Sequence, residues 1–263
     1  MLNIVLPIAG QGSRFVAAGY KQPKPLIPVH GFPMIEVVIN NLRPQQPHHF
    51  TFVVLQKHLD DFELHKTLLL LDPDCTIIPV SQVTEGAACT VLQAREIINN
   101  DMPLMIANCD QWVDIDINDY LHEIDKAKAG RYPDVDGLIM TMWADHPKWS
   151  YVSLDKENQV TQVVEKKVIS HDATVGIYNF KRGCDFVDAA EKMISKNQRV
   201  NNEFYVAPVY NEMIGLGKKI SIYNVGKVGD RMFGIGTPDD LMSFLRHEKS
   251  SKVIARLKQN YLK

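Results

Sequence analysis

A glycine-rich turn followed by two cationic side chains is the part of this sequence best suited to chemistry. Residues 10–15 read Gly-Gln-Gly-Ser-Arg-Phe, and Lys24 follows ten residues after Arg14, between two prolines. Gly10 and Gly12 let backbone N–H groups approach an anion closely, while Arg14 and Lys24 add positive charge. We therefore interpret this stretch as a cradle for the phosphates of a nucleoside triphosphate.

Two other glycine motifs do not fit this stretch. The dinucleotide fingerprint has a third glycine where Phe15 stands, and the Walker loop has four residues between its glycines, followed by Lys-Ser or Lys-Thr. A turn that only joins a strand to a helix would account for the two glycines, but not for Arg14 followed by Pro-Lys-Pro at residues 23–25. The pattern therefore favours a phosphate site.

These motifs resemble the signature of the sugar-phosphate nucleotidylyltransferase family, typified by glucose-1-phosphate thymidylyltransferase. The signature is a glycine-rich loop ending in Ser/Thr-Arg, then Pro-Lys-Pro-Leu, matched by residues 10–14 and 23–26. The resemblance covers nearly the whole chain, in the family's short single-domain form. It implies transfer of a nucleoside monophosphate to a sugar 1-phosphate, with pyrophosphate released. It also implies that Arg14 and Lys24 are catalytic, and that Ala9, Gly10, Gly12 and Ser13 bind the nucleotide.

The resemblance places base recognition in a loop at residues 82–88. The family reads the base with a Gln and a glycine turn, which correspond to Gln82, Gly86 and Ala87. A Gln amide donates and accepts hydrogen bonds, which suits the Watson–Crick edge of a base. Gln82 alone is equally consistent with a solvated loop residue. Together with the glycine turn it favours a base pocket, with a preference for a pyrimidine.

Asp110 follows a predicted buried strand, where the family carries an aspartate that binds Mg²⁺. A hard cation needs oxygen ligands, although Asp110 could instead cap the next turn. Relatives commonly have a second metal-binding aspartate where this chain has Gly234. Either Asp110 holds the metal with phosphates and waters, or Asp230 contributes.

The acceptor side of the family's site corresponds to Glu165, Lys166 and Gly176, and we add Tyr151. The family's Glu-Lys pair ends a strand, and its lysine contacts the acceptor phosphate. A lone Glu-Lys pair is usually a solvated strand end, and aromatic residues on strands are more often core. Position in the chain is therefore what favours these residues as acceptor-binding.

The elements expected to position these residues alternate between strand and helix in the first half of the chain. Predicted strands cover residues 4–6, 50–55, 75–80 and 103–107, and predicted helices cover residues 33–42, 59–71 and 86–98, the last capped by Thr84 or Glu85. This alternation predicts an α/β fold with a Rossmann-like mixed, mainly parallel sheet flanked by helices. Such folds bind ligands at the carboxyl ends of the strands, where the three candidate loops fall.

The second half changes pattern. Short extended segments at residues 137–142, 151–154, 159–165 and 174–180 predict a small antiparallel extension for the acceptor. Helices at 184–195 and 205–216, a strand at 219–225 and a helix starting at Thr237 follow. We interpret the chain as one domain: a nucleotide half (1–134), an acceptor half (135–237) and a C-terminal helical region (238–263).

Composition narrows the class of protein. The 263 residues carry a net charge of −2, which argues against binding nucleic acid or an anionic membrane. The four cysteines show no paired C-x-x-C spacing, and no apolar run is long enough to span a membrane. We expect a cytoplasmic protein with reduced thiols, and the oligomeric state is left open.

The expected reaction needs no general base, because a phosphate monoester is largely ionised at neutral pH. We expect Mg²⁺ as cofactor, an NTP and a phosphorylated acceptor as partners, and a role in capsule or lipopolysaccharide precursor synthesis. One alternative is a CTP-dependent cytidylyltransferase for a non-sugar, such as phosphocholine or a phosphorylated amino-acid derivative. Others are a glycosyltransferase using the D-x-D at residues 114–116, and a non-catalytic nucleotide-binding subunit.

Overall fold

The protein is built on a mixed sheet, seen in a computed structural model that describes residues 1–128 and 135–260. Nine strands follow the order β10-β9-β11-β6-β1-β4-β5, with β8 paired to β11 and β12 paired to β8. Their bounds are β1 Leu2–Ile8, β4 His48–Leu55, β5 Thr76–Val80, β6 Leu104–Ala107, β8 Gly137–Trp143, β9 Ser150–Leu154, β10 Val160–Glu165, β11 Asp172–Phe180 and β12 Ile220–Lys227.

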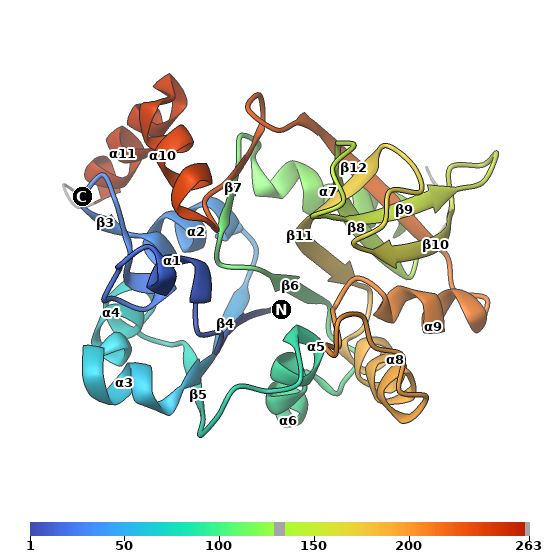
Figure 1. The fold of residues 1–263 in the computed structure, drawn as a ribbon. Helices are drawn as coiled ribbons and strands as arrows, with labels where there is room; N and C mark the ends of the chain where they lie inside the picture. The colour runs from blue at the N-terminus through green and yellow to red at the C-terminus, as the bar shows by residue number, and fades with distance from the viewer. Residues whose placement is uncertain (129–134, 261–263) are drawn as a thin grey trace.

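The sheet has a parallel half and an antiparallel half. Strand β1 lies between β4 and β6, parallel to both, and β4 is parallel to β5. Strand β11 runs antiparallel to β6, β8 and β9, and β9 runs antiparallel to β10. The mixed α/β fold and its antiparallel extension are therefore as predicted, and Figure 1 shows the two halves side by side.

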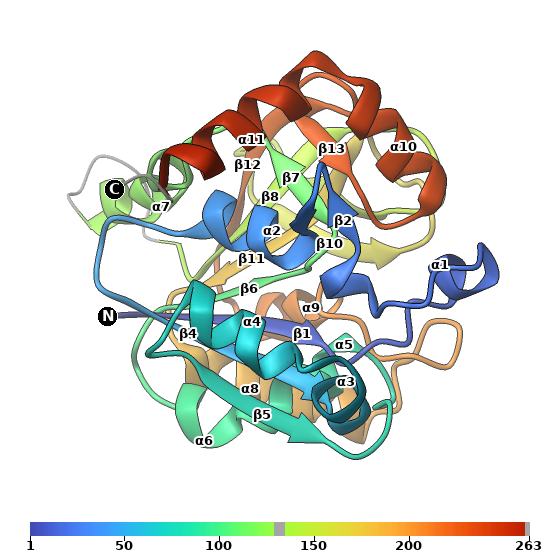
Figure 2. The same cartoon turned by 90° about the vertical axis from the view of Figure 1, so that its left-hand side faces the viewer.

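Helices cover both faces, because the strands bury side chains on both. Ile4 and Leu6 of β1 belong to one core cluster, and Val5 belongs to the other. The first cluster packs against α2 (Met34–Leu42), α4 (Leu64–Leu71), α7 (Ile117–Lys128), α10 (Pro238–Arg246) and α11 (Glu248–Asn260). The second packs against α5 (Ala87–Val91), α6 (Arg95–Ile98), α8 (Gly183–Ser195) and α9 (Val209–Gly215). Figure 2 shows α10 and α11, in red, above α2.

Several helix boundaries differ from the prediction. The helix expected at residues 59–71 is two helices, α3 (Gln56–Phe62) and α4, separated at Glu63, whose φ of 51° is left-handed. The helix expected from residue 86 is broken by a 3₁₀ turn at Leu92–Ala94, and Gly86 occupies its N-cap without a side-chain cap. The helix expected from residue 205 begins only at Val209, because the backbone of Phe204 pairs with Glu85 and Ala88 instead.

Short elements complete the fold around the site. Helix α1 (Ser13–Ala17) follows the glycine turn, and a 3₁₀ turn covers Lys24–Leu26. Strand β7 (Gln111–Val113) pairs antiparallel with β13 (Met232–Gly234), and β2 (Pro28–Val29) pairs with β3 (Phe32–Pro33). The pairing of β7 with β13 brings the segment after Asp110 to the segment before Gly236.

Helix α10 begins as the sequence predicts. The Thr237 hydroxyl accepts a hydrogen bond from the Asp240 N–H, with Pro238 at the first helical position.

Within the described residues, no helix is both long enough and apolar enough to cross a membrane.

Candidate functional site

An ion pair joins the two motifs that the sequence singled out. The Nζ of Lys24 lies 2.5 Å from Oδ2 of Asp110, although the two residues are 86 positions apart. Lys24 follows Pro23, whose ψ of 149° is extended, while Asp110 follows the buried strand β6. Because β1 and β6 are parallel neighbours, their carboxyl ends bring the glycine turn and the Asp110 loop together.

Gly12 is needed where the chain approaches Lys24. Its φ of 63° is left-handed, and a Cβ at this position would lie 3.3 Å from Cβ of Lys24. A larger residue would therefore be strained and would press on the lysine stem. The glycine turn thus supports the lysine that pairs with Asp110.

Gly236 supports Asp110 from the other side. A Cβ at Gly236 would overlap the Asp110 carboxylate, and the Ile235 N–H donates to the Asp110 carbonyl at 2.8 Å. The backbone of residues 235–236 therefore forms a wall against which the carboxylate rests. This explains a glycine here without any requirement for an unusual φ.

The electrostatics of Lys24 are dominated by two opposing effects. Burial favours the neutral amine and acts to lower its pKa, but the Asp110 carboxylate favours the ammonium and outweighs burial. The net effect raises the pKa of Lys24, so the side chain remains charged at neutral pH. Cys109, next to this pair, is buried, and burial raises the pKa of its thiol to about 11.

A cavity of about 690 Å³ opens beside this ion pair. It brings together five of the residues predicted from the resemblance to form the site, from both halves of the chain. These are Arg14, Asp110, Glu165, Lys166 and Gly176. Ala87, from the predicted base loop at residues 82–88, is a sixth predicted residue that lines it. The cavity is therefore lined by residues from both halves of the chain.

One wall of the cavity, where acceptor-binding residues were predicted, is built by the ends of β10 and β9. Glu165 is buried and accepts a hydrogen bond from the Ser150 hydroxyl. Burial raises the pKa of the Glu165 carboxyl, opposed by that hydrogen bond and by Lys166. Gly176, with a φ of 83°, has no room for a side chain because the Asn108 amide fills that space.

The structure places Tyr151 away from the cavity. Its side chain is fully buried, its hydroxyl donates to the His146 carbonyl at 2.8 Å, and it does not line the cavity. Alternation along β9 explains this placement, since Ser150 faces the cavity and its neighbour faces the core.

The other residues that were predicted to bind the nucleotide lie in or next to the glycine turn and the base loop, and they do not line the cavity. Ala9 is buried, Gly10 is exposed and Ser13 begins α1. Gln82 is exposed in the loop after β5. Gly86, with a φ of 128°, lies against the Phe204 backbone, which a Cβ would approach to 2.5 Å.

Some residues that line the cavity were not predicted as site residues. They are Lys148, Glu203, Tyr205, Asp239 and Asp240. The sequence signal for the last two was read only as a helix start. Tyr205 and Glu203 follow a turn at Asn201 and Asn202, whose φ values of 50° and 64° are left-handed.

The D-x-D alternative has no support from the geometry. Asp114 pairs with Lys249 at 2.8 Å, and Asp116 accepts from the N–H and the amide of Asn118 at the start of α7. Neither aspartate lines the large cavity. Asp116 therefore caps the start of α7.

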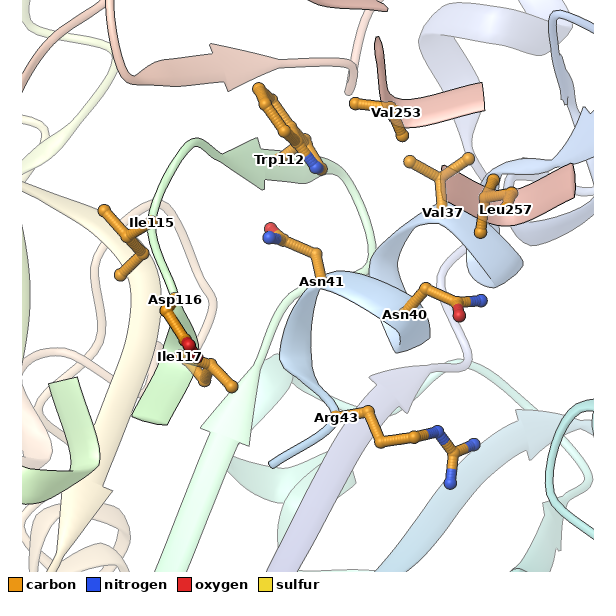
Figure 3. Close-up of a pocket in the computed structure, with 10 residues that line it drawn as sticks. All are labelled: Val37, Asn40, Asn41, Arg43, Trp112, Ile115, Asp116, Ile117, Val253 and Leu257. Atoms are coloured by element: carbon orange, nitrogen blue, oxygen red, sulfur yellow. The ribbon is translucent and has the colours of Figure 1, made fainter. Parts of the chain in front are cut away.

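Asp116 instead lines a second, smaller cavity of about 350 Å³, shown in Figure 3. This cavity lies between α2, the segment around β7 and α11. The Asn41 amide joins two of these elements, since it donates to the Val113 carbonyl and accepts from the Val113 N–H, both at 2.8 Å. The Arg43 guanidinium is paired with Asp72 at 2.9 Å.

A divalent cation fits the large cavity through Asp110. Among the described residues, no three His, Cys, Asp or Glu side chains are grouped to hold a metal ion. Mg²⁺ does not require such a group, because it retains waters and binds one or two carboxylates with substrate phosphates. Asp230 contacts Lys249 and does not line the cavity.

Comparisons with known proteins identify a family and a fold. The nucleotidyl transferase family matches residues 3–210. The Bifunctional protein GlmU of Methanococcus aeolicus is 23% identical over 185 residues; the match covers 68% of this chain and only 40% of that protein's length.

Solved structures give the same fold. A nucleoside-diphosphate-sugar pyrophosphorylase from Vibrio cholerae RC9 is 25% identical, with a TM-score of 0.74 over 92% of this chain and 99% of that one. An inositol-1-phosphate CTP transferase from T. maritima shares the fold at 16% identity, with a TM-score of 0.69 over 96% of this chain and 95% of that one.

Proposed function

This chain belongs to the nucleotidyl transferase family, and from that premise we propose that it transfers a nucleoside monophosphate from a nucleoside triphosphate to a sugar 1-phosphate, releasing pyrophosphate. The observation that carries the proposal is the shared cavity. Arg14 and Asp110 on one wall and Lys166 on the other line a single space of about 690 Å³. Two phosphorylated substrates need cations from both sides, and this arrangement supplies them.

The triphosphate binds the glycine turn in this proposal. Backbone N–H groups of residues 10–13 and the side chains of Arg14 and Lys24 neutralise its charge. The base lies toward the loop of Gln82, Gly86 and Ala87, where the amide of Gln82 favours a pyrimidine. These roles remain proposals for the residues named.

The acceptor phosphate binds opposite, beside Lys166. One of its oxygens attacks the α-phosphorus in line, forming a new P–O bond, while the bond from the α-phosphorus to the oxygen bridging to the β-phosphorus breaks. That oxygen leaves with pyrophosphate. The attacking phosphate has a second pKa of about 6 and is already ionised at neutral pH, so no residue must remove a proton.

Rate enhancement then comes from positioning and charge. Lys24, held by Asp110, and Arg14 stabilise negative charge on the phosphates, and Lys166 orients the nucleophile. Asp110 would hold Mg²⁺, which when bound neutralises phosphate charge and orients the leaving group. Sugar hydroxyls are expected to bind Glu165 and the backbone at Gly176.

A second candidate acceptor is a phosphorylated non-sugar that carries a positive charge, such as phosphocholine or a phosphorylated amino-acid derivative, activated with CTP. The observation in its favour is that three carboxylates, those of Glu203, Asp239 and Asp240, also line the cavity. Carboxylates near the acceptor would attract a cationic group and gain nothing from a neutral sugar beyond hydrogen bonds.

The test is a matrix of the four nucleoside triphosphates against sugar 1-phosphates, inositol 1-phosphate, phosphocholine and phosphorylated amino-acid derivatives. Pyrophosphate release is recorded in the presence of Mg²⁺. We expect release with a pyrimidine triphosphate and one class of acceptor only. Tight nucleotide binding with no release across the matrix would instead favour a non-catalytic nucleotide-binding protein, and release of a nucleoside diphosphate would favour a glycosyltransferase.

A further inference from the structure

Lys166 is held in an unusual backbone conformation. Its φ of 56° lies in the left-handed region, which a lysine adopts rarely. Its N–H donates to the Trp149 carbonyl at 3.0 Å, which turns the chain sharply after β10. Conformations of this kind persist where the surroundings fix them, often at functional sites. The backbone therefore directs the Lys166 side chain away from the strand.

The amine of Lys166 is fixed by Tyr205. Its Nζ donates to the Tyr205 hydroxyl at 2.5 Å and lies 4.6 Å from the centre of the Tyr205 ring. Burial, followed by the nearby Glu203 carboxylate, raises the pKa of the phenol. The hydroxyl therefore stays protonated at neutral pH: it accepts from the lysine and keeps its own proton for the carboxylate.

Tyr205 is in turn fixed to the base loop. The preceding residue, Phe204, donates through its N–H to the Glu85 carbonyl at 2.8 Å and accepts from the Ala88 N–H at 3.0 Å. Arg199, at the start of the same loop, pairs with the Glu85 carboxylate at 3.1 Å. The Phe204 backbone also lies so close to Gly86 that a Cβ at that position would approach it to 2.5 Å.

Two left-handed asparagines shape the loop itself. Asn201 and Asn202 are the central residues of a turn in which Val200 and Glu203 exchange two backbone hydrogen bonds of 3.0 Å. Two consecutive positive φ values define a type I′ turn, a conformation that asparagine tolerates well. The turn places Glu203 and Tyr205 on the cavity.

We propose that Tyr205 is a positioning residue: its hydroxyl holds the Lys166 ammonium where the acceptor phosphate binds. Tyr205 itself lies on a loop whose backbone is hydrogen-bonded to the base loop. This inference rests on the proposed function for the role of Lys166. It goes beyond that function because it names the group that orients the lysine, the phenol of Tyr205.

Two measurements test it, and the first needs no substrate. Tyr205→Phe keeps the ring and removes only the hydroxyl. We expect acetylation of Lys166 by an amine-reactive reagent, followed by mass spectrometry of its peptide, to become several-fold faster. The matched control is Tyr151→Phe, which removes a phenol that bonds the His146 carbonyl, and it should leave the Lys166 rate unchanged.

The second measurement is a double-mutant cycle in the pyrophosphate assay. Tyr205→Phe should raise the KM for the acceptor about tenfold, which corresponds to ~1.4 kcal/mol, with the KM for the triphosphate unchanged. In a Lys166→Ala background the same change should have less than about a twofold effect, because Tyr205 acts through the lysine. A purely structural role would give equal losses in both backgrounds.

An unchanged acetylation rate at Lys166, or equal losses in both backgrounds, would overturn the inference. The proposed function fails in a different way, when the unmodified chain releases no pyrophosphate with any acceptor. In that case the acetylation comparison still decides whether Tyr205 holds Lys166. Thermal unfolding of each variant establishes that the compared proteins are folded.

Discussion

The Lys24 ammonium and the Asp110 carboxylate meet at 2.5 Å across the carboxyl ends of two adjacent parallel strands. In the proposed reaction this pair keeps the lysine charged and aimed at the phosphates, and it places the carboxylate that would hold Mg²⁺ at the same point. We expect Lys24→Ala to lower kcat about 100- to 1000-fold, the loss typical of removing one group that stabilises a transition state. Pyrophosphate release measures this, and near-normal activity in the variant would show that Lys24 is not catalytic.

Gly236→Ala tests the wall that supports Asp110. The added Cβ would overlap the Asp110 carboxylate and force it to move, and a displacement of about 1 Å in a site of this kind costs about 100-fold in rate. The control is Gly215→Ala at the end of α9, where nothing lies within 4 Å of the added Cβ. That variant should retain full activity and gain slightly in stability. Equal activity in the two variants would contradict the supporting role of Gly236.

Removal of divalent cations should abolish activity. A chelator in excess is expected to stop pyrophosphate release, and added Mg²⁺ is expected to restore it, because Asp110 and the phosphates together supply the oxygen ligands that this ion prefers. Asp110→Asn should then require a higher Mg²⁺ concentration for half-maximal rate. Activity that persists in the chelator would contradict the assignment of Asp110.

Glu165 should lower stability at neutral pH. Its pKa is raised in the folded state, chiefly by burial, so the folded protein binds more protons than the unfolded chain. Stability therefore falls as pH rises from the ordinary carboxyl pKa of 4.5 through the folded pKa. Glu165→Gln is therefore expected to raise Tm near pH 7.5, with the gain disappearing below pH 4.5. The same variant should bind the acceptor less well, since the carboxylate faces the cavity.

Glu212 is a control for which the expected change in Tm has the opposite sign. Burial acts to raise its pKa, but Lys196 and Lys192 outweigh burial and lower it. Its contribution to stability is fully present above the ordinary carboxyl pKa of 4.5 and is lost as pH falls through the folded pKa. Glu212→Gln should thus lower Tm near pH 7.5, with a shrinking difference in acid. Thermal unfolding at both pH values checks the pair, and Tm changes of the same sign in the two variants would contradict this account.

The sequence predicts much of the fold because its strands are apolar and its turns are marked. The buried strands β1, β4 and β6 were all expected, and the cap at Thr237 was expected with its proline. The break at Glu63 was not, because a left-handed glutamate between Phe62 and Leu64 carries no sequence signal. The late start of α9 was missed because Phe204 is used in pairing with the base loop, a contact between distant segments.

Part of the candidate site was likewise predictable from the sequence, and part was not. Arg14, Asp110, Glu165 and Lys166 were found from motifs and strand ends, and they do converge on one cavity. The burial of Tyr151 was not predictable, because alternation along a strand fixes which residues share a face but not which face meets the cavity. The contact of Tyr205 with Lys166 was not predictable either, since the two residues lie 39 positions apart and neither alone indicates the other.

The fate of each phosphorus atom tests the central claim most directly. The enzyme is incubated with Mg²⁺, a phosphorylated acceptor and a triphosphate labelled at either the α- or the γ-phosphorus. We predict that the α-label appears in a nucleotide joined to the acceptor and the γ-label appears only in pyrophosphate, in equal amounts and only when the acceptor is present. Label recovered in a nucleoside diphosphate, or pyrophosphate formed without any acceptor conjugate, would contradict the account.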